Sequence, residues 1–113
     1  MQVQVNHDNH LIIAQDTSDR LGREVETSLS KYAQQISRIE MHLGDVNGTK
    51  HGDSDKRCML EARLDHLHPI TATHQAPSVQ LAIDGALRKL DHALSHAIGK
   101  LRAHKRGAPE EPS

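Results

Sequence analysis

VQLAIDGALRKLDHALSHAIGKL, residues 79–101, is the stretch that decides the fold of this chain. Ser78, just before it, suits the N-cap of a helix. The apolar residues then recur every three or four positions, which predicts one long helix with a buried ridge. That ridge consists of Val79, Ile83, Ala86, Leu87, Leu90, Leu94, Ala97, Ile98 and Leu101. A helix with one apolar side has to pack against another layer, and the rest of the chain supplies a sheet.

Four segments upstream alternate apolar and polar residues, the period of a half-buried strand. We predict strands at Gln2 to His7, Arg38 to Asp45, about Lys56 to Leu64, and Ile70 to Gln75. A polar loop, Gly44 to Asp55, follows the second strand and is long enough to be mobile. A short turn near His66 to Pro69 precedes the fourth strand.

A second helix is predicted between the first two strands. Its apolar residues at helical spacing are Leu21, Val25, Leu29, Tyr32 and Ile36, and Thr17 or Ser18 is placed to cap its start. The order is therefore β-α-β-β-β-α, an α+β fold with one four-stranded mixed sheet and both helices on one face. The right-handed crossover rule makes the first two strands parallel if they are neighbours, and short turns make the other pairs antiparallel.

Composition sets the outer limits of this prediction. With 113 residues the chain fits one domain, which we assign to residues 1–106, followed by a disordered tail at 107–113. Tyr32 is the only aromatic residue, so the core has to be aliphatic. The single cysteine, Cys58, cannot form an internal disulfide, and no apolar run approaches the ~20 residues of a membrane span. Met1 leads straight into a strand pattern, which favours a cytoplasmic protein.

Charge is distributed very unevenly. The net charge is −1, yet the segment from Ala86 to Arg106 holds six basic residues and only one acid, Asp91. The basic residues are Arg88, Lys89, Lys100, Arg102, Lys105 and Arg106. A basic segment on an acidic body indicates a polyanionic partner such as RNA, and the plainer alternative is a solvated helix face.

Histidines extend this basic segment. Lys89, His92, His96 and Lys100 follow one another at helical spacing and form a stripe beside the apolar ridge, flanked by Arg88 and Arg102. Histidine has an unperturbed pKa of about 6.5, so a phosphate-rich partner would favour its charged form. His92 and His96 could also share a metal ion, but no third ligand stands at a diagnostic spacing, and the pair His66 and His68 is equally unspecific. We therefore predict no metal and no cofactor.

No arrangement typical of an enzyme is visible. Cys58 alternates with apolar residues and reads as a core residue of the third strand, and the chain has no glycine-rich phosphate loop and no nucleophile elbow. The predicted open sheet face carries no aromatic residue, which excludes base stacking as the main mode of RNA binding. That face consists of Gln2, Gln4, Arg38, Glu40, His42, Arg57, Met59, Glu61 and Arg63. Basic helix edges on such a sheet are closer to double-stranded-RNA-binding domains, which read shape.

Two segments resemble a known family. They are DKRCMLEARL at 55–64 and AIDGALRKL at 82–90. They resemble the hibernation promotion factor and ribosome-associated inhibitor family of bacteria, once called modulators of the nitrogen-type sigma factor. The resemblance runs from Met1 to about Leu101, and it implies the fold predicted above. It also implies binding to rRNA of the small ribosomal subunit, in the mRNA and tRNA channel, and translation inhibition in stress or stationary phase.

The matched positions in the last helix are Asp84, Lys89 and Leu90. The resemblance makes Lys89 the expected rRNA contact and Leu90 a core position. Family helices continue with more lysine or arginine within two turns, whereas this chain has His92 and His96 there. Binding would then be weaker or pH-dependent, or its contacts would move toward Arg102, Lys105 and Arg106. The chain resembles the short type, which lacks the second, ribosome-dimerising domain.

The leading interpretation is a ribosome hibernation factor, a non-enzymatic protein that is monomeric when free and takes neither a membrane nor a small-molecule substrate as partner. Two alternatives stay open. One is a protein-interaction module acting on a transcription or stress-response partner, and the other is a metal or stress-response buffer that uses the histidines.

Overall fold

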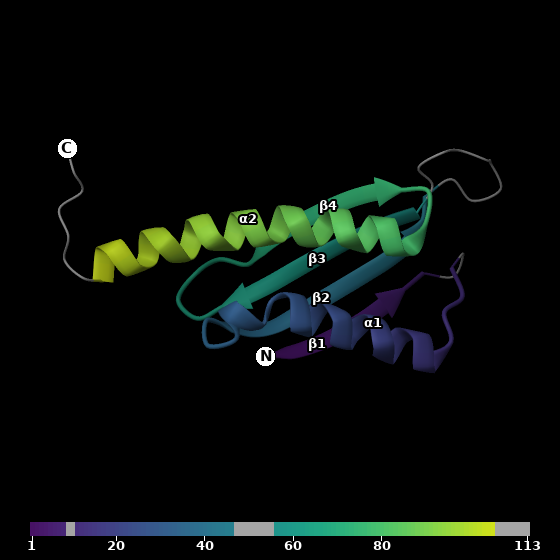
Figure 1. The fold of residues 1–113 in the computed structure, drawn as a ribbon, viewed down its shortest axis with the longest axis horizontal. Coiled ribbons are helices and arrows are strands. Elements are labelled where there is room, and N and C mark those ends of the chain that lie inside the picture. The colour runs from purple at the N-terminus through teal and green to yellow at the C-terminus, as the bar shows by residue number, and fades with distance from the viewer. Residues whose placement is uncertain (9–10, 47–55, 106–113) are drawn as a thin grey trace.

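Two helices lie on one face of a four-stranded sheet (Figure 1). The computed structural model describes residues 1–8, 11–46 and 56–105, with side chains as far as residue 100. The elements along the chain are β1 (Gln2–His7), α1 (Gln15–Ser28), a 3-10 turn η1 (Ser30–Tyr32), β2 (Ile36–Asp45), β3 (Lys56–Leu64), β4 (Ile70–Ala76) and α2 (Val79–Lys105). The predicted β-α-β-β-β-α order is confirmed.

The strands lie in the order β1-β2-β3-β4. β1 pairs with β2 in parallel, and the two other pairs are antiparallel, as the crossover rule and the short turns predicted. The register aligns residues across three strands, so that Gln4 lies beside Glu40 and Glu40 beside Glu61. Side chains in one such row point to the same face of the sheet.

A single aliphatic core fills the space between the sheet and the helices. Its most deeply buried side chains are Leu29, Ile39, Met41, Leu60, Ile83, Leu90, Leu94, Val25 and Cys58. Tyr32 is the only aromatic member, and no charged or polar residue is fully buried in the described part of the chain. The predicted aliphatic core and the predicted ridge of α2 are thus confirmed for the residues whose side chains are described.

The prediction for the first helix was wrong at both ends. α1 ends at Ser28, Tyr32 closes a 3-10 turn, and Ile36 begins β2. Leu29, Tyr32 and Ile36 are nevertheless buried in the same core. A 3-10 turn and a helix both return a side chain to one face after three or four residues, so apolar spacing alone could not mark the helix end.

The first helix also begins earlier than predicted. Its N-cap is Ala14, which has no capping side chain, and both Thr17 and Ser18 lie inside the helix. The cap predicted at Ser78 is confirmed, because its Oγ accepts a hydrogen bond of 3.2 Å from the backbone N–H of Leu81. β2 starts at Ile36 rather than Arg38, and β4 reaches Ala76. Most of the predicted loop, 47–55, and the predicted tail, 107–113, lie outside the described residues.

Candidate nucleic-acid interface

The candidate surface is the outer side of α2, which we call the basic helix face and define by Arg88, Lys89, His92, His96 and Lys100. All five residues are exposed. The opposite side of the helix supplies Ile83, Leu90 and Leu94 to the core. Burial of that apolar ridge fixes which side of α2 faces solvent, and the C-terminal end of the helix projects past the sheet (Figure 1).

Three further predicted contacts lie near the end of the helix. Arg102 and Lys105 are in the last turns of α2, beyond the last described side chain, and Arg106 lies outside the described residues.

A close approach between α2 and β4 fixes the height of the helix above the sheet. A Cβ atom at Gly85 would lie 2.0 Å from Cδ2 of His74, so a side chain at this position would collide with the imidazole. His74 belongs to β4, and its ring fills the space that a side chain at position 85 of the helix would need. This pair could not be predicted from the sequence, because the contact joins residues whose facing depends on the packing of helix on sheet.

Lys89 lies on the side of α2 that faces β4. Its Nζ donates a hydrogen bond of 3.0 Å to the carbonyl oxygen of Thr73 on that edge strand. An ammonium group has three donors, so this bond holds the side chain in place and leaves donors for a phosphate. It also covers one open carbonyl of the edge strand.

The other side of α2 meets the 3-10 turn. The hydroxyl of Tyr32 donates hydrogen bonds to Oδ1 of Asp91, at 2.5 Å, and to the carbonyl oxygen of Asp91, at 3.2 Å. Lys31 Nζ lies 3.3 Å from the same carboxylate and 5.2 Å from the centre of the Tyr32 ring. Asp91, the single acid among the basic residues of α2, is therefore held by two partners from η1.

The electrostatics follow from these contacts. The hydrogen bond from Tyr32 and the nearby Lys31 ammonium lower the pKa of Asp91 below 3.8. Burial and the Asp91 carboxylate raise the pKa of Tyr32 above 10.0, so the hydroxyl stays protonated and remains a donor at neutral pH. The hydrogen bond and charge of Asp91 raise the pKa of Lys31.

Lys31 is a residue that sequence reasoning missed. With Tyr32, Arg88, Asp91, His92 and Ser95 it lines a shallow surface depression between η1 and α2. Three basic groups from two elements, Lys31, Arg88 and His92, thus surround one acid. The only signal in the sequence is a lysine at the end of the first helical pattern, and nothing local says that this turn lies against α2.

The open sheet face, on the side away from the helices, distributes its charges differently. Arg38 Nη2 lies 3.0 Å from Glu40 Oε2 and also donates to the side chain of Gln4. Arg63 Nη2 lies 3.7 Å from Glu61 Oε1. Each of these arginines has an acid two residues away on its own strand, so its charge is locally compensated.

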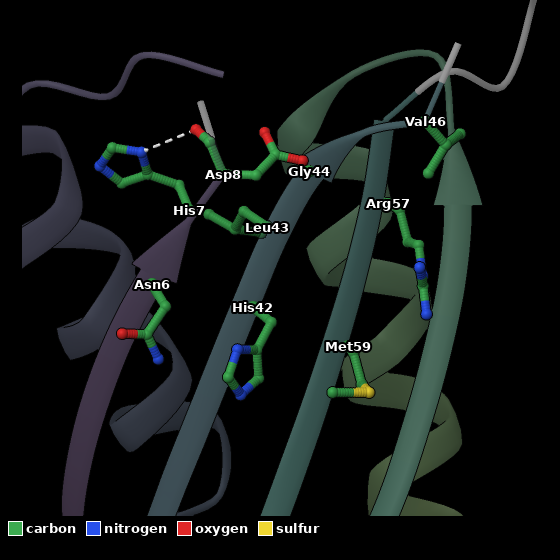
Figure 2. Close-up of a pocket in the computed structure, with 9 residues that line it drawn as sticks. All are labelled: Asn6, His7, Asp8, His42, Leu43, Gly44, Val46, Arg57 and Met59. Carbon is green, nitrogen blue, oxygen red and sulfur yellow. Dashed lines mark hydrogen bonds between the residues drawn. The ribbon is translucent and has the colours of Figure 1, made fainter. Parts of the chain in front are cut away.

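A shallow pocket lies near the end of the open face (Figure 2). The residues that line this pocket are Asn6, His7, Asp8, His42, Leu43, Gly44, Val46, Arg57 and Met59. His42 on β2 and Met59 on β3 are register neighbours on this face. No residue of the basic helix face contributes to this pocket.

Cys58 is a core residue, as the sequence analysis expected. Its side chain is fully buried, and burial raises the pKa of its thiol to about 12. The thiolate that nucleophilic chemistry would need is therefore strongly disfavoured at neutral pH. Among the described residues, no helix is long and apolar enough to cross a bilayer.

Comparisons with known proteins agree with this architecture. A ribosomal subunit interface protein from Coxiella burnetii superposes with a TM-score of 0.66 at 18% identity, over 88% of this chain and 99% of that one. The N-terminal domain of Protein Y from Thermus thermophilus gives a TM-score of 0.66 at 14% identity, over 85% of this chain and 98% of that one. At these identities the likeness concerns the fold. No significant match was found among curated protein sequences.

The family comparison confirms the resemblance noted in the sequence. Residues 10–102 match the family described as Sigma 54 modulation protein / S30EA ribosomal protein. The match spans α1, β2, β3, β4 and most of α2. Of the eight predicted contacts, it includes the five whose side chains are described, and also Arg102. The chain therefore belongs to the Sigma 54 modulation protein / S30EA ribosomal protein family.

Proposed function

We propose that this protein is a ribosome hibernation factor. It binds rRNA of the small ribosomal subunit in the mRNA and tRNA channel and blocks translation in stress or stationary phase. It does so in the cytoplasm, by steric occupation and without enzymatic chemistry. The family description, which names a ribosomal protein, and the solved structure of a ribosomal subunit interface protein support the ribosome as partner.

One observation carries the proposal. Arg88 and Lys100 are exposed on the basic helix face, and neither forms an ion pair with any described residue. Of the two acids on α2, Asp84 accepts a hydrogen bond from Gln80, and Asp91 is held by Tyr32 and Lys31. Uncompensated cations on a rigid helix can neutralise phosphates, each with release of a counterion.

The shape of the surface supports a helix-edge mode of binding. Lys89 is held on the side of α2 that faces β4, and Arg88 lies beside Lys31 on the side that faces η1. Basic side chains therefore flank α2 on both sides. Such a ridge suits contacts with phosphates and sugars across a groove rather than contacts with stacked bases. Contacts of this kind bind with salt-sensitive affinity, so mRNA and tRNA can displace the protein when they are abundant.

The test is binding to purified small subunits in the presence of competing ligands. The protein should cosediment with small subunits and not with large subunits, and binding should fall steeply between 50 and 200 mM salt. Adding initiator tRNA with mRNA should release it. The double variant Lys89→Glu/Lys100→Glu should lose most binding while circular dichroism shows that it remains folded.

The outcomes separate this proposal from the alternative. Binding that persists in the presence of tRNA would place the protein outside the channel. Full retention of function by the double variant, together with capture of a transcription or stress-response protein, would favour the protein-interaction module. No association with small subunits at low salt would reject the proposal.

A further inference from the structure

Three potential metal ligands meet on the open sheet face, away from the basic helix face. The register pairs Glu40 on β2 directly with Glu61 on β3, and His42 follows Glu40 by two residues on the same face. One ligand atom from each of the three side chains lies within 4.8 Å of the other two. This is the one such cluster among the described residues, and it includes neither His92 nor His96.

The spacing of the ligand atoms fits one ion. His42 Nε2 lies 3.5 Å from Glu40 Oε1. Two ligands bound to the same zinc ion at about 2.1 Å in a tetrahedral arrangement are separated by roughly 3.4 Å. Glu40 and His42 therefore already stand at the separation that zinc requires, and a small rotation of the Glu61 side chain brings in a third ligand.

The surrounding arginines leave these oxygens accessible. Arg38 contacts Oε2 of Glu40, while Oε1 is the atom turned toward His42. Arg63 contacts Glu61 at the longer distance of 3.7 Å. Hydrogen-bonding partners of this kind orient a ligating carboxylate, as outer-shell groups do around protein metals.

The acids also have a reason to attract a cation. Two like charges directly opposite one another on neighbouring strands destabilise a sheet. Glu40 and Glu61 are such a pair, and their side chains are only 18% and 22% exposed, so water screens them incompletely. An ion between the two carboxylates would convert this repulsion into shared ligation.

We propose that Glu40, His42 and Glu61 bind one zinc ion on the open sheet face. A mixed imidazole and carboxylate set suits zinc better than magnesium or calcium, which prefer oxygen ligands alone. The fourth position faces solvent and takes a water molecule. This site departs from the expectation, drawn from sequence alone, that the protein takes no metal, and it does not depend on the proposed ribosomal function.

The test is calorimetric titration of the whole protein with zinc at pH 7.5. The tightest binding event should have a stoichiometry of one, and magnesium should give none. His42→Gln and Glu61→Gln should each weaken that event by more than about 100-fold, because each removes a direct ligand. The control, His92→Gln/His96→Gln, removes the helical histidine pair and should retain it.

Two further measurements keep the result interpretable. Thermal unfolding without metal shows whether each variant is folded, and X-ray absorption of the zinc-loaded protein should give one imidazole with oxygen ligands. Tight zinc binding that survives His42→Gln would overturn the proposal. Loss of tight zinc binding in His92→Gln/His96→Gln would also overturn it. So would zinc binding by the wild-type protein that is no tighter than binding by His42→Gln and Glu61→Gln.

Discussion

Basic residues occupy both the open sheet face and the basic helix face, but acids lie close to them in different ways. Two of the three arginines of the sheet face, Arg38 and Arg63, form ion pairs, whereas Arg88 and Lys100 on the helix form none with the described residues. On the sheet, the strand register and the two-residue period place Arg38 beside Glu40 and Arg63 near Glu61. On α2, Asp91 is held by Tyr32 and Lys31 of η1, and Asp84 accepts a hydrogen bond from Gln80. For binding a polyanion, the positions of the counter-charges matter more than the number of cations on a surface.

The largest expected effect is a difference between two charge reversals. Arg88→Glu should weaken binding to small subunits by about 100-fold, because it removes a phosphate contact and adds repulsion. The matched change on the sheet, Arg63→Glu, should weaken it by less than about threefold. Filter binding at 100 mM salt, with circular dichroism as a check on folding, would measure both. Equal losses would show that the comparison between the two faces is wrong.

The next effect comes from moving the helix itself. Gly85→Ala should destabilise the protein by about 2 kcal/mol, because the new Cβ collides with the His74 ring and pushes α2 away from β4. Gly99→Ala is the control on the same helix. A Cβ there meets nothing within 4 Å, so it should stabilise the protein by up to about 1 kcal/mol through helix propensity. Urea unfolding measures both changes. A neutral Gly85→Ala would mean that the close approach to His74 does not set the position of the helix.

A smaller effect concerns the acid of the basic helix. Tyr32→Phe should lower the free energy of unfolding by about 1 kcal/mol, a modest value because the Asp91 side chain is 44% exposed. The same change should raise the pKa of Asp91 toward 3.8. The folded-state pKa is lowered, so this stabilisation is present above pH 3.8 and is lost as the pH falls through the folded value. The difference between variant and wild type should therefore shrink below pH 3.8.

Two measurements check that prediction. Unfolding free energies from pH 7 to pH 2.5 give the stability difference, and carbon-detected NMR titration gives the pKa of Asp91 in both proteins. A pKa of Asp91 unchanged by Tyr32→Phe would contradict the role assigned to the hydroxyl.

The smallest effect tests the histidines. Affinity for small subunits should rise by roughly three- to tenfold from pH 8 to pH 6, because a phosphate-rich partner favours the charged form of histidine. His92→Gln/His96→Gln should flatten this profile. His42→Gln should leave it unchanged, because His42 lies on the open sheet face and not on the basic helix face. A flat wild-type profile would remove the histidines from the binding surface.

Local patterns located most of the fold. The alternation over Gln2–His7 and Lys56–Leu64 predicted both strands with their observed bounds, because a half-buried strand imposes a period of two on its own residues. The end of α1 could not be found in this way. Leu29, just past the end of α1, Tyr32 in the 3-10 turn and Ile36 in β2 all stay in the core, so burial keeps the same spacing after the helix has ended.

The candidate site divides in the same manner. Arg88, Lys89, His92, His96 and Lys100 were found in the sequence because they share one helix, where position along the chain fixes the facing. Lys31 was missed, as were the pairs His74 with Gly85 and Glu40 with Glu61, because each contact joins separate elements.

Periodicity and composition act within a segment, so they were enough to predict the four strands, the two helices, their order, the aliphatic core and the side of α2 that carries the charge. Which of these charges are paired depends on how separate segments pack against one another. Tyr32 reaches Asp91 across 59 positions of the chain, and the strand register places Glu40 against Glu61 and His42. Coulomb and hydrogen-bond energies depend on distance in space, and the packing of helices on the sheet is what sets that distance.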